Sequence, residues 1–236
     1  MDIQQKLFWL KNVGISFFCG EHPRSITDSA LKASAKISQS QKTDMPQTQQ
    51  AQTVALQVKD LSELNTAKEK FSLSALKKTA TRTVLGQGPL QPKLMCVLEA
   101  PDTDADRSGI LLSGPNGELL HKMLTAIHLD PVQDVYITTL SPWRTPGNRP
   151  LTETERATFL SFLTKEIQLV QPKKIMLYGA GLAAVLLHTD TLAKARGTWH
   201  QWENIPTRVT LALNTVRATP QRAQAWEDLQ AVEKLG

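Results

Sequence analysis

Apolar residues follow two alternating patterns along the second half of the chain, one typical of buried strands and the other of helices. Short apolar runs occupy residues 93–100, 134–140, 174–179 and 208–213. Helical spacing of apolar residues covers residues 116–128, 152–170, 180–189 and 220–235. Strands that alternate with helices of this length form parallel sheets covered on both faces. We therefore predict an α/β fold, a three-layer α/β/α sandwich with a central four-stranded parallel sheet.

Two further helical features accompany this pattern. Thr152 followed by Glu155 predicts a capping box at the start of the helix over 152–170. Helical spacing from Leu61 to Phe71 predicts another helix over residues 60–80. We expect the folded domain to span residues 59–236.

The residues before this domain divide into two segments. Residues 1–24 carry Leu7, Leu10 and Val13 in helical spacing, which predicts a short N-terminal helical segment. Residues 25–58 are rich in Ser, Gln, Thr, Lys and Ala and nearly free of aromatics. Such a segment buries too little apolar surface to offset the entropy of ordering, so we expect a disordered linker.

The net charge of +5 comes from the N-terminal part of the chain. Residues 1–90 hold 12 Lys and Arg against 7 Asp and Glu, whereas residues 91–236 hold 15 of each. A basic excess of this kind fits nucleic-acid binding and equally a basic tail that favours solubility. Charge alone therefore leaves both interpretations open.

Cysteine usage and hydropathy limit the other classes of protein. The two cysteines, Cys19 and Cys96, provide neither a disulfide framework nor a four-cysteine metal site. No apolar run approaches the about 20 residues of a membrane helix, and the first residues lack the basic start of a secretory signal. We expect an unprocessed cytoplasmic protein that is monomeric and does not contact membranes.

Polar residues cluster where the predicted strands end, and ligands of parallel sheets bind beyond those ends. Glu99 directly follows the first strand, so it can orient a water or belong to a solvated acidic loop. Residues 113–117 lead into a helix whose N–H groups can meet a phosphate; the alternative is a plain loop capped by Asn116. Arg144, Asn148 and Arg149 lie on a proline-rich loop suited to phosphate contact or to a surface turn.

Two other features favour structural roles. Gly179 and Gly181 superficially match a dinucleotide fingerprint, but they follow the third strand and lack the acidic residue that should come later. Close helix packing is the better explanation. His200, between Trp199 and Trp202, can act as a base or, more simply, as a structural histidine.

The order of three segments resembles the family 4 type of uracil-DNA glycosylases. The stretch LGQGPLQPKLMCVLEAPDTDADRSGILLSGPNGELLHKML is similar to a first signature in which GEAPG is followed by an acidic pair, PFVG and AGxLL. VYITTLSPWRTPGNRPLTETE resembles the second signature, and KARGTWHQW with AWEDL resembles the closing region. The resemblance implies the glycosylase fold, a DNA partner that contains uracil or damaged bases, and a set of site residues.

Those site residues fall into three groups. Glu99 takes the place of the catalytic glutamate. The positions of the base pocket are Ala100, Pro101, Leu112 and Thr139. The positions that contact the DNA backbone are Gly114, Pro146, Gly147, Asn148, Arg149, Asn214 and Arg217.

Several of these positions depart from the family. Leu98 and Asp102 replace glycines, Leu112 replaces an aromatic, Thr139 replaces an asparagine, and Leu211 replaces a histidine in an ungapped match. Family members also hold an iron–sulfur cluster on four cysteines. The matching positions here are Phe71 or a neighbour, Ser74, Trp143 and Phe159, so we predict no cluster and no metal.

Three functions follow from these residues. The first is a divergent glycosylase of base excision repair, which hydrolyses the N-glycosidic bond of a flipped uracil or damaged base. The second is a catalytically inactive module that binds DNA or a protein partner on the same fold. The third is a nucleotide-binding domain that uses the loop at Gly179.

Overall fold

The central sheet holds one more strand than the sequence predicts. The structure is a computed structural model that describes residues 47–189, 191–216 and 219–235. Within them five strands form one sheet, in the order β2-β1-β3-β5-β4. The strands are β1 (Leu94–Leu98), β2 (Val135–Thr139), β3 (Ile175–Tyr178), β4 (Trp199–Trp202) and β5 (Ile205–Thr210). β2, β1, β3 and β5 are parallel, as predicted, and β4 pairs antiparallel with β5.

The extra strand arises from a hairpin. Glu203 and Asn204 join β4 to β5 with φ angles of 45° and 68°, the backbone of a tight two-residue hairpin turn. β4 lies at the edge of the sheet and its residues are half-buried or exposed. Since it is not an apolar run, hydropathy gave no sign of it.

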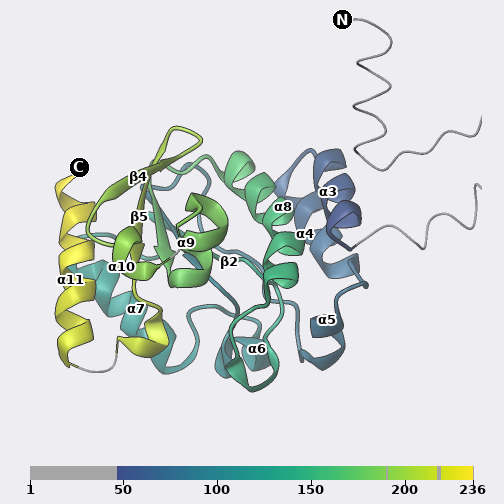
Figure 1. Ribbon diagram of the computed structural model, residues 1–236, viewed down its shortest axis with the longest axis horizontal. Coiled ribbons are helices and arrows are strands. Elements are labelled where there is room, and N and C mark those ends of the chain that lie inside the picture. Colours follow the sequence, from purple (N-terminus) through teal and green to yellow (C-terminus); the bar gives the residue numbers. More distant parts are fainter. Residues whose placement is uncertain (1–46, 190, 217–218, 236) are drawn as a thin grey trace, which may run out of the picture. The chain divides into compact units, whose positions relative to one another are not determined.

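Helices cover both faces of the sheet and confirm the three-layer α/β/α architecture (Figure 1). α8 (Glu153–Val170) and α9 (Ala180–Leu187) pack on one face, and α7 (Gly114–Ala126) and α11 (Thr219–Lys234) pack on the other. The capping box of α8 is present, because Thr152 and Glu155 exchange their backbone and side-chain hydrogen bonds. Three short elements complete this part, namely α6 (Thr103–Ser108), α10 (Leu192–Ala195) and the 3-10 turn η2 (Leu213–Thr215).

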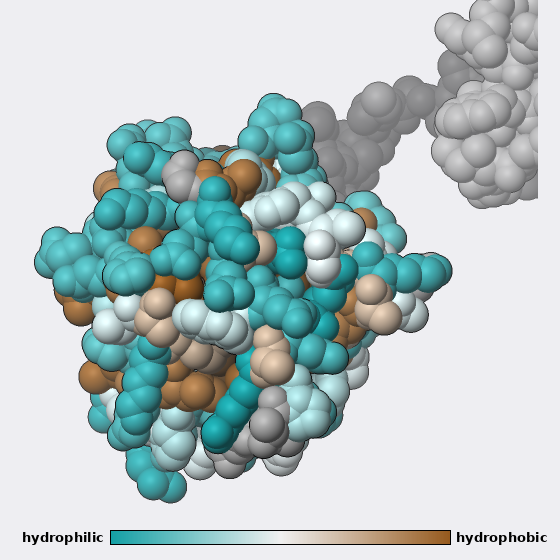
Figure 2. Space-filling model, turned by 90° about the vertical axis from the view of Figure 1, so that its left-hand side faces the viewer, coloured by the Kyte–Doolittle hydropathy of each residue, from teal (hydrophilic) through white to brown (hydrophobic). Residues whose placement is uncertain are grey.

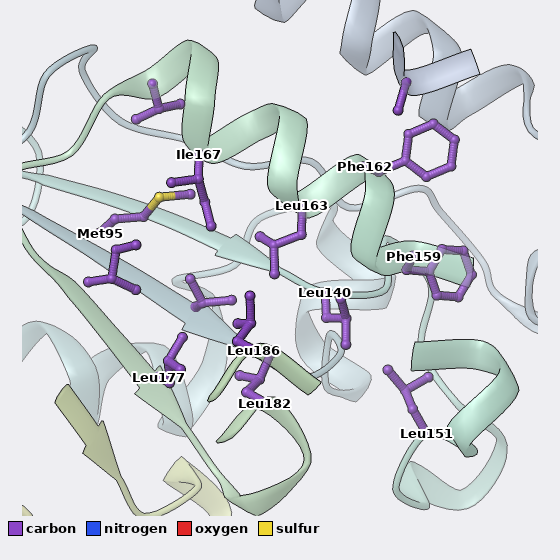
Figure 3. Close-up of a cluster of buried hydrophobic side chains, with 14 of the residues drawn as sticks. Met95, Leu140, Leu151, Phe159, Phe162, Leu163, Ile167, Leu177, Leu182 and Leu186 are labelled. Atoms are coloured by element: carbon purple, nitrogen blue, oxygen red, sulfur yellow. The ribbon is translucent and has the colours of Figure 1, made fainter. Parts of the chain in front are cut away.

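The apolar core therefore has two layers. One fills the space between the sheet and α8 with α9, where Met95, Leu163 and Leu182 meet (Figure 3). The other lies under α7 and α11 and includes Cys96 and Leu120. Among the described residues no helix is long and apolar enough to cross a membrane.

The expected linker is wrong over its last part. Residues 47–57 form α3 (Gln47–Gln57), which lies beside α8 (Figure 1). Its contact face consists of Ala51, Val54, Ala55 and Val58, at the i, i+3, i+4 and i+7 spacing of an amphipathic helix. These small side chains let α3 approach α8 closely, and Thr48 Oγ1 lies 3.2 Å from Thr158 Oγ1. Residues 1–46, including the predicted N-terminal helical segment, lie outside the described residues.

The predicted helix over residues 60–80 is two helices. α4 (Leu61–Lys70) ends at Phe71, and α5 (Ala75–Thr79) begins after Ser74, whose hydroxyl accepts a hydrogen bond from the Leu76 amide. Serine favours a helix N-cap over a helix interior because its hydroxyl competes for backbone groups.

Two buried ionic groups tie these elements together. Lys68 of α4 donates to Glu166 of α8 at 2.5 Å, and Tyr136 and Thr138 of β2 also donate to that carboxylate. At the other end of the sheet, the fully buried Asp228 of α11 accepts from Arg196 and Arg208. The Arg196 and Asp228 pair joins the two closing segments, KARGTWHQW and AWEDL. Burial of either carboxylate without its partners would cost free energy. These contacts therefore fix the positions of α8 and α11 against the rest of the fold.

Candidate active site

The carboxyl ends of β1 and β2 bring Glu99 and Thr139 to one edge of the sheet. Leu98 and Thr139 are partners in the strand register, and the Ser141 amide donates to the Glu99 carbonyl at 3.1 Å. The segments that follow β1 and β2 are therefore still hydrogen-bonded to each other past the last residue of each strand. This is the edge at which parallel sheets bind ligands.

The side chains of Glu99 and Thr139 nevertheless turn to different faces. Side chains alternate along a strand, so Glu99 follows Val97 toward α8. Thr139 follows Ile137 toward the α7 side and is only 2% exposed. The two residues are neighbours along the carboxyl edge, but their side chains lie on opposite faces of the sheet.

Glu99 is held in place by α8 and by the loop before it. Its Oε1 accepts from Arg156 Nε at 3.0 Å and from the Leu151 amide at 3.3 Å. The Glu99 side chain remains 24% exposed. Among the described residues, the hydrogen bonds and ion pair of this carboxylate fall on Oε1.

Gly181 completes the surroundings of Glu99. A Cβ on Gly181 would lie 2.5 Å from Glu99 Oε1 and 2.9 Å from Arg156 Nε. The first turn of α9 therefore approaches the ion pair more closely than any side chain permits. This close approach gives the glycine the packing role that we preferred to dinucleotide binding.

The loop after Glu99 is organised by Asp102. Its carboxylate caps α6 by accepting from the Ala105 amide at 2.9 Å and also accepts from Asn116 Nδ2 at 2.7 Å. Asn116 is thus not the cap of α7, because Ser113 occupies that position. Asp102 therefore links the loop after β1 to the first turn of α7, while Pro101 beside it is buried and Ala100 is half-buried.

Leu112 lies on the loop that enters α7, and Gly114 is the first residue of that helix. Leu112 is partly buried against the core layer under α7. Its backbone lies so close to Gly117 that a Cβ there would be 2.2 Å from the Leu112 carbonyl carbon. Gly114 has a φ of +69° and packs against the Asp104 side chain, which favours glycine for both reasons.

The proline-rich loop after β2 is exposed but internally bonded. Arg149 forms a bidentate pair with Glu155, at 2.7 and 2.8 Å, and Arg144 Nε donates to Asn148 Oδ1 at 2.8 Å. The bond from Arg149 is the main reason why the pKa of Glu155 falls to about 2. Pro146 and Gly147 are exposed within the short 3-10 turn η1 (Pro146–Asn148). Both arginines therefore have protein partners that a phosphate would have to displace.

The remaining candidates lie farther along the sheet or outside the described residues. Asn214 is exposed on η2, beyond the carboxyl end of β5 and on the same edge as Glu99. Arg217 lies outside the described residues, so its expected contact with the DNA backbone stays a prediction. His200 Nε2 on β4 contacts the Ala195 carbonyl at 2.8 Å and Thr198 Oγ1 at 3.2 Å, in keeping with the structural interpretation.

Three of the four positions matched to cluster cysteines come together as an aromatic group. Phe71 stacks on Trp143 at 6.5 Å between ring centroids, and Phe159 packs edge-on to Trp143 at 5.7 Å. Ser74 nearby is buried as the cap of α5. Rings and a hydroxyl cannot replace thiolate ligands, so these residues do not fit an iron–sulfur cluster. Within the described ranges, no group of three or more His, Cys, Asp or Glu is arranged to hold a metal.

Comparison with known proteins gives the same family as the segments and the fold. The model of the uracil DNA glycosylase superfamily matches residues 85–230, so the chain belongs to this superfamily. Within it the chain is type 4-like. It is 30% identical over 168 residues to the type-4 uracil-DNA glycosylase of Archaeoglobus fulgidus, covering 68% of this chain and 84% of that protein. The Thermotoga maritima type-4 enzyme is 28% identical over 161 residues, covering 66% and 83%.

A further relative is of another kind. A DNA polymerase of Bacillus phage SP01 is 27% identical over 165 residues, which cover 70% of this chain but 18% of that protein. The region of similarity is therefore a part of a much longer protein in that case.

Arg156 is a site residue that our sequence analysis did not assign, and for Gly181 the sequence indicated close packing but not that Glu99 is its neighbour. Arg156 follows the capping box by one residue, which places it in the first turn of α8 near the carboxyl edge. That position was a usable signal. Its contact with Glu99 depends on how α8 lies across the sheet, which no local pattern contains.

Proposed function

We propose that the chain is a uracil-DNA glycosylase-like hydrolase, which cleaves the N-glycosidic bond of a flipped uracil or damaged base in DNA. The observation that carries the proposal is the placement of Glu99 at the carboxyl edge, with Oε1 fixed by Arg156 and the Leu151 amide. Oε2 then orients a water toward the sugar carbon. The water oxygen forms the new bond to the sugar carbon and gives a proton to Glu99 Oε2, while the bond to the base breaks and the base leaves with the electron pair.

The rest of the edge would hold the substrate. Ala100, Pro101, Leu112 and Thr139 surround the flipped base, and the loops at Gly114, at residues 146–149 and at Asn214 with Arg217 contact the backbone. Phosphate oxygens offer Arg149 the same bidentate geometry that Glu155 now provides. DNA binding would thus exchange one anion for another at this arginine.

The replaced residues predict a slow enzyme with relaxed base preference. Leu112 covers a base without the aromatic stacking that contributes about 1–3 kcal/mol. The hydroxyl of Thr139 replaces the two hydrogen bonds of an amide, so the enzyme should discriminate less well between uracil and cytosine. A missing donor at position 211 lowers the rate by roughly 10²–10³.

A second candidate is a DNA-binding module without catalysis. It is favoured by the same departures, because an aliphatic Leu112 and a buried Thr139 supply neither stacking nor an amide for the base edge. In that case the backbone contacts remain and base release is absent.

Base release and DNA binding can be measured on the same protein. Single- and double-stranded oligonucleotides with one uracil are incubated with the full chain, and abasic sites are then cleaved with alkali. Scission that Glu99→Gln abolishes and Glu69→Gln retains supports the hydrolase, since Glu69 is exposed on α4, away from the site. A salt-sensitive gel shift without scission supports the second candidate. If neither scission nor a gel shift is observed, both candidates are rejected.

The proposal includes no iron–sulfur cluster. It is supported by the packed rings of Phe71, Trp143 and Phe159, which occupy the positions of the family's ligands. Protein purified without oxygen should be colourless and free of stoichiometric iron. Brown protein with about four irons per chain would show the cofactor assignment to be wrong.

A further inference from the structure

A pocket of about 560 Å³ opens at the amino ends of the strands, on the edge opposite Glu99. Leu94, the first residue of β1, lies in its wall, together with Ile127 and Leu129 from the end of α7 and Val232 from α11. Its volume falls within the usual range of binding pockets. We call it the amino-edge pocket.

Lysines lie on one side of the amino-edge pocket. Lys93, Lys173 and Lys174 all contribute to its lining, against the single carboxylate of Glu233. Lys93 pairs with Asp134 at 2.9 Å, and Glu233 contacts His128 at 2.8 Å. The adjacent Lys173 and Lys174 thus leave the pocket with a local positive charge.

Lys174 is poorly compensated in this position. Burial and the nearby charge of Lys173 lower its pKa. Its Nζ donates to the Val232 carbonyl at 3.0 Å, a neutral acceptor. A carboxylate placed beside the two lysines would stabilise both ammonium groups.

Apolar residues are also exposed around this edge. Leu235 in the pocket lining is 43% exposed, Val132 in the loop before β2 is 66% exposed, and Leu90 before β1 is 61% exposed. Figure 2 faces the side on which α11 lies and shows apolar residues exposed among hydrophilic ones. Exposed apolar side chains bordered by charged ones are a feature of protein-binding surfaces.

We infer that the amino-edge pocket binds an acidic segment of another protein, which inserts a large apolar side chain between α7 and α11 and places carboxylates against Lys173 and Lys174. The apolar walls explain why the ligand is a peptide and not a nucleic acid, which would need polar or aromatic contacts. The complementary charge selects acidic over basic segments. Because this pocket and Glu99 lie at opposite edges, such a partner and DNA can bind at the same time.

The inference is tested with random dodecapeptides displayed on phage and selected on the full chain. Enriched peptides should combine Asp or Glu with a large apolar residue. A fluorescein-labelled synthetic copy of the most enriched peptide should bind about tenfold or more weakly to Lys173→Glu. Lys78→Glu, the same charge reversal at an exposed residue of α5, should leave the affinity unchanged.

Three results would overturn the inference. The first is a selection that yields no consensus or a basic one. The second is an acidic peptide that binds Lys173→Glu and Leu235→Asp as tightly as the parent chain. The third is displacement of the peptide by a uracil-free oligonucleotide, which would make the pocket part of a nucleic-acid surface.

Discussion

The Glu99 carboxylate depends on a space beside α9 that only glycine leaves open. The atoms that a Cβ on Gly181 would meet are the ends of two flexible side chains, Glu99 Oε1 and Arg156 Nε. These ends can move aside at little cost to the fold. A side chain at position 181 should therefore change the geometry of Glu99 more than it changes the stability of the fold.

Gly181→Ala should separate these two properties. Alanine is the better helix residue by about 0.5–1 kcal/mol, so the unfolding temperature should stay the same or rise slightly. Base release should fall about tenfold or more, because the displaced carboxylate no longer orients the water. Thermal unfolding and the alkali-scission assay measure both, with Ala184→Ser on the exposed side of α9 as the control. Loss of stability without loss of base release would contradict this account of Gly181.

Glu155 links the proline-rich loop to α8 and should give the protein part of its pH dependence. Its pKa of about 2 lies below the ordinary value of 4.5, chiefly because Arg149 donates to it. A carboxyl whose pKa is lower in the folded state stabilises the fold above pH 4.5 and loses that effect as the pH falls toward 2.

Glu155→Gln should therefore destabilise the protein by about 1 kcal/mol at pH 7, the usual effect of a weakened helix cap. The difference from the parent chain should shrink between pH 5 and pH 3, where the unfolded carboxyl takes up its proton. Urea unfolding at several pH values measures it. A difference that stays constant over this range would mean that Glu155 does not titrate as its contacts indicate.

Among the elements, α8 connects the site to the aromatic group. Its first turn carries Arg156, and one turn later Phe159 packs on Trp143, with Phe162 edge-on to Phe71 at 5.4 Å. Figure 3 shows Phe159 and Phe162 on this helix. All four rings are buried. They join α4 and the loop after β2 to α8.

Phe159→Ala should lower the free energy of unfolding by about 3–5 kcal/mol, since it leaves a cavity among rings that cannot close it. Trp226→Ala removes a larger ring that is 40% exposed on α11, and it should destabilise the protein much less. Chemical unfolding of both variants gives the comparison. Similar losses for the two would argue against a stabilising aromatic group.

The elements that sequence analysis found and missed differ in how they are buried. The strands β1, β2 and β3 are largely apolar because helices cover both faces, and such runs are visible in any sequence. β5 includes a charged residue and begins three residues before the run predicted over residues 208–213, so the prediction found this strand but displaced its bounds. β4 has one partner and half-buried residues, and α3 buries the small Ala51 and Ala55 among glutamines. The formation of β4 and α3 therefore depends on tertiary contacts that the local sequence pattern does not contain. In the same way, the position of Glu99 could be predicted, while its partner Arg156 required the crossing of α8 over the sheet.

At the scale of the whole molecule, the two edges of the sheet differ in chemistry. The carboxyl edge carries Glu99 and the proline-rich loop with its two arginines. The amino edge carries the amino-edge pocket with its lysines. Residues 91–236 hold equal numbers of acidic and basic residues, so the net charge of +3 of the domain over residues 59–236 comes from residues 59–90. Binding of DNA at the carboxyl edge should then depend on particular arginines there.

Charge reversal at either edge should show this division. Arg144→Glu, on the exposed loop after β2, should weaken binding to an oligonucleotide about tenfold and reduce the slope of log affinity against log salt by about 1. Lys173→Glu changes the net charge by the same amount at the other edge, so it should leave both quantities unchanged. Fluorescence anisotropy over a range of salt concentrations measures them. Because a general electrostatic attraction would respond equally to both variants, equal losses would mean that DNA does not select the carboxyl edge.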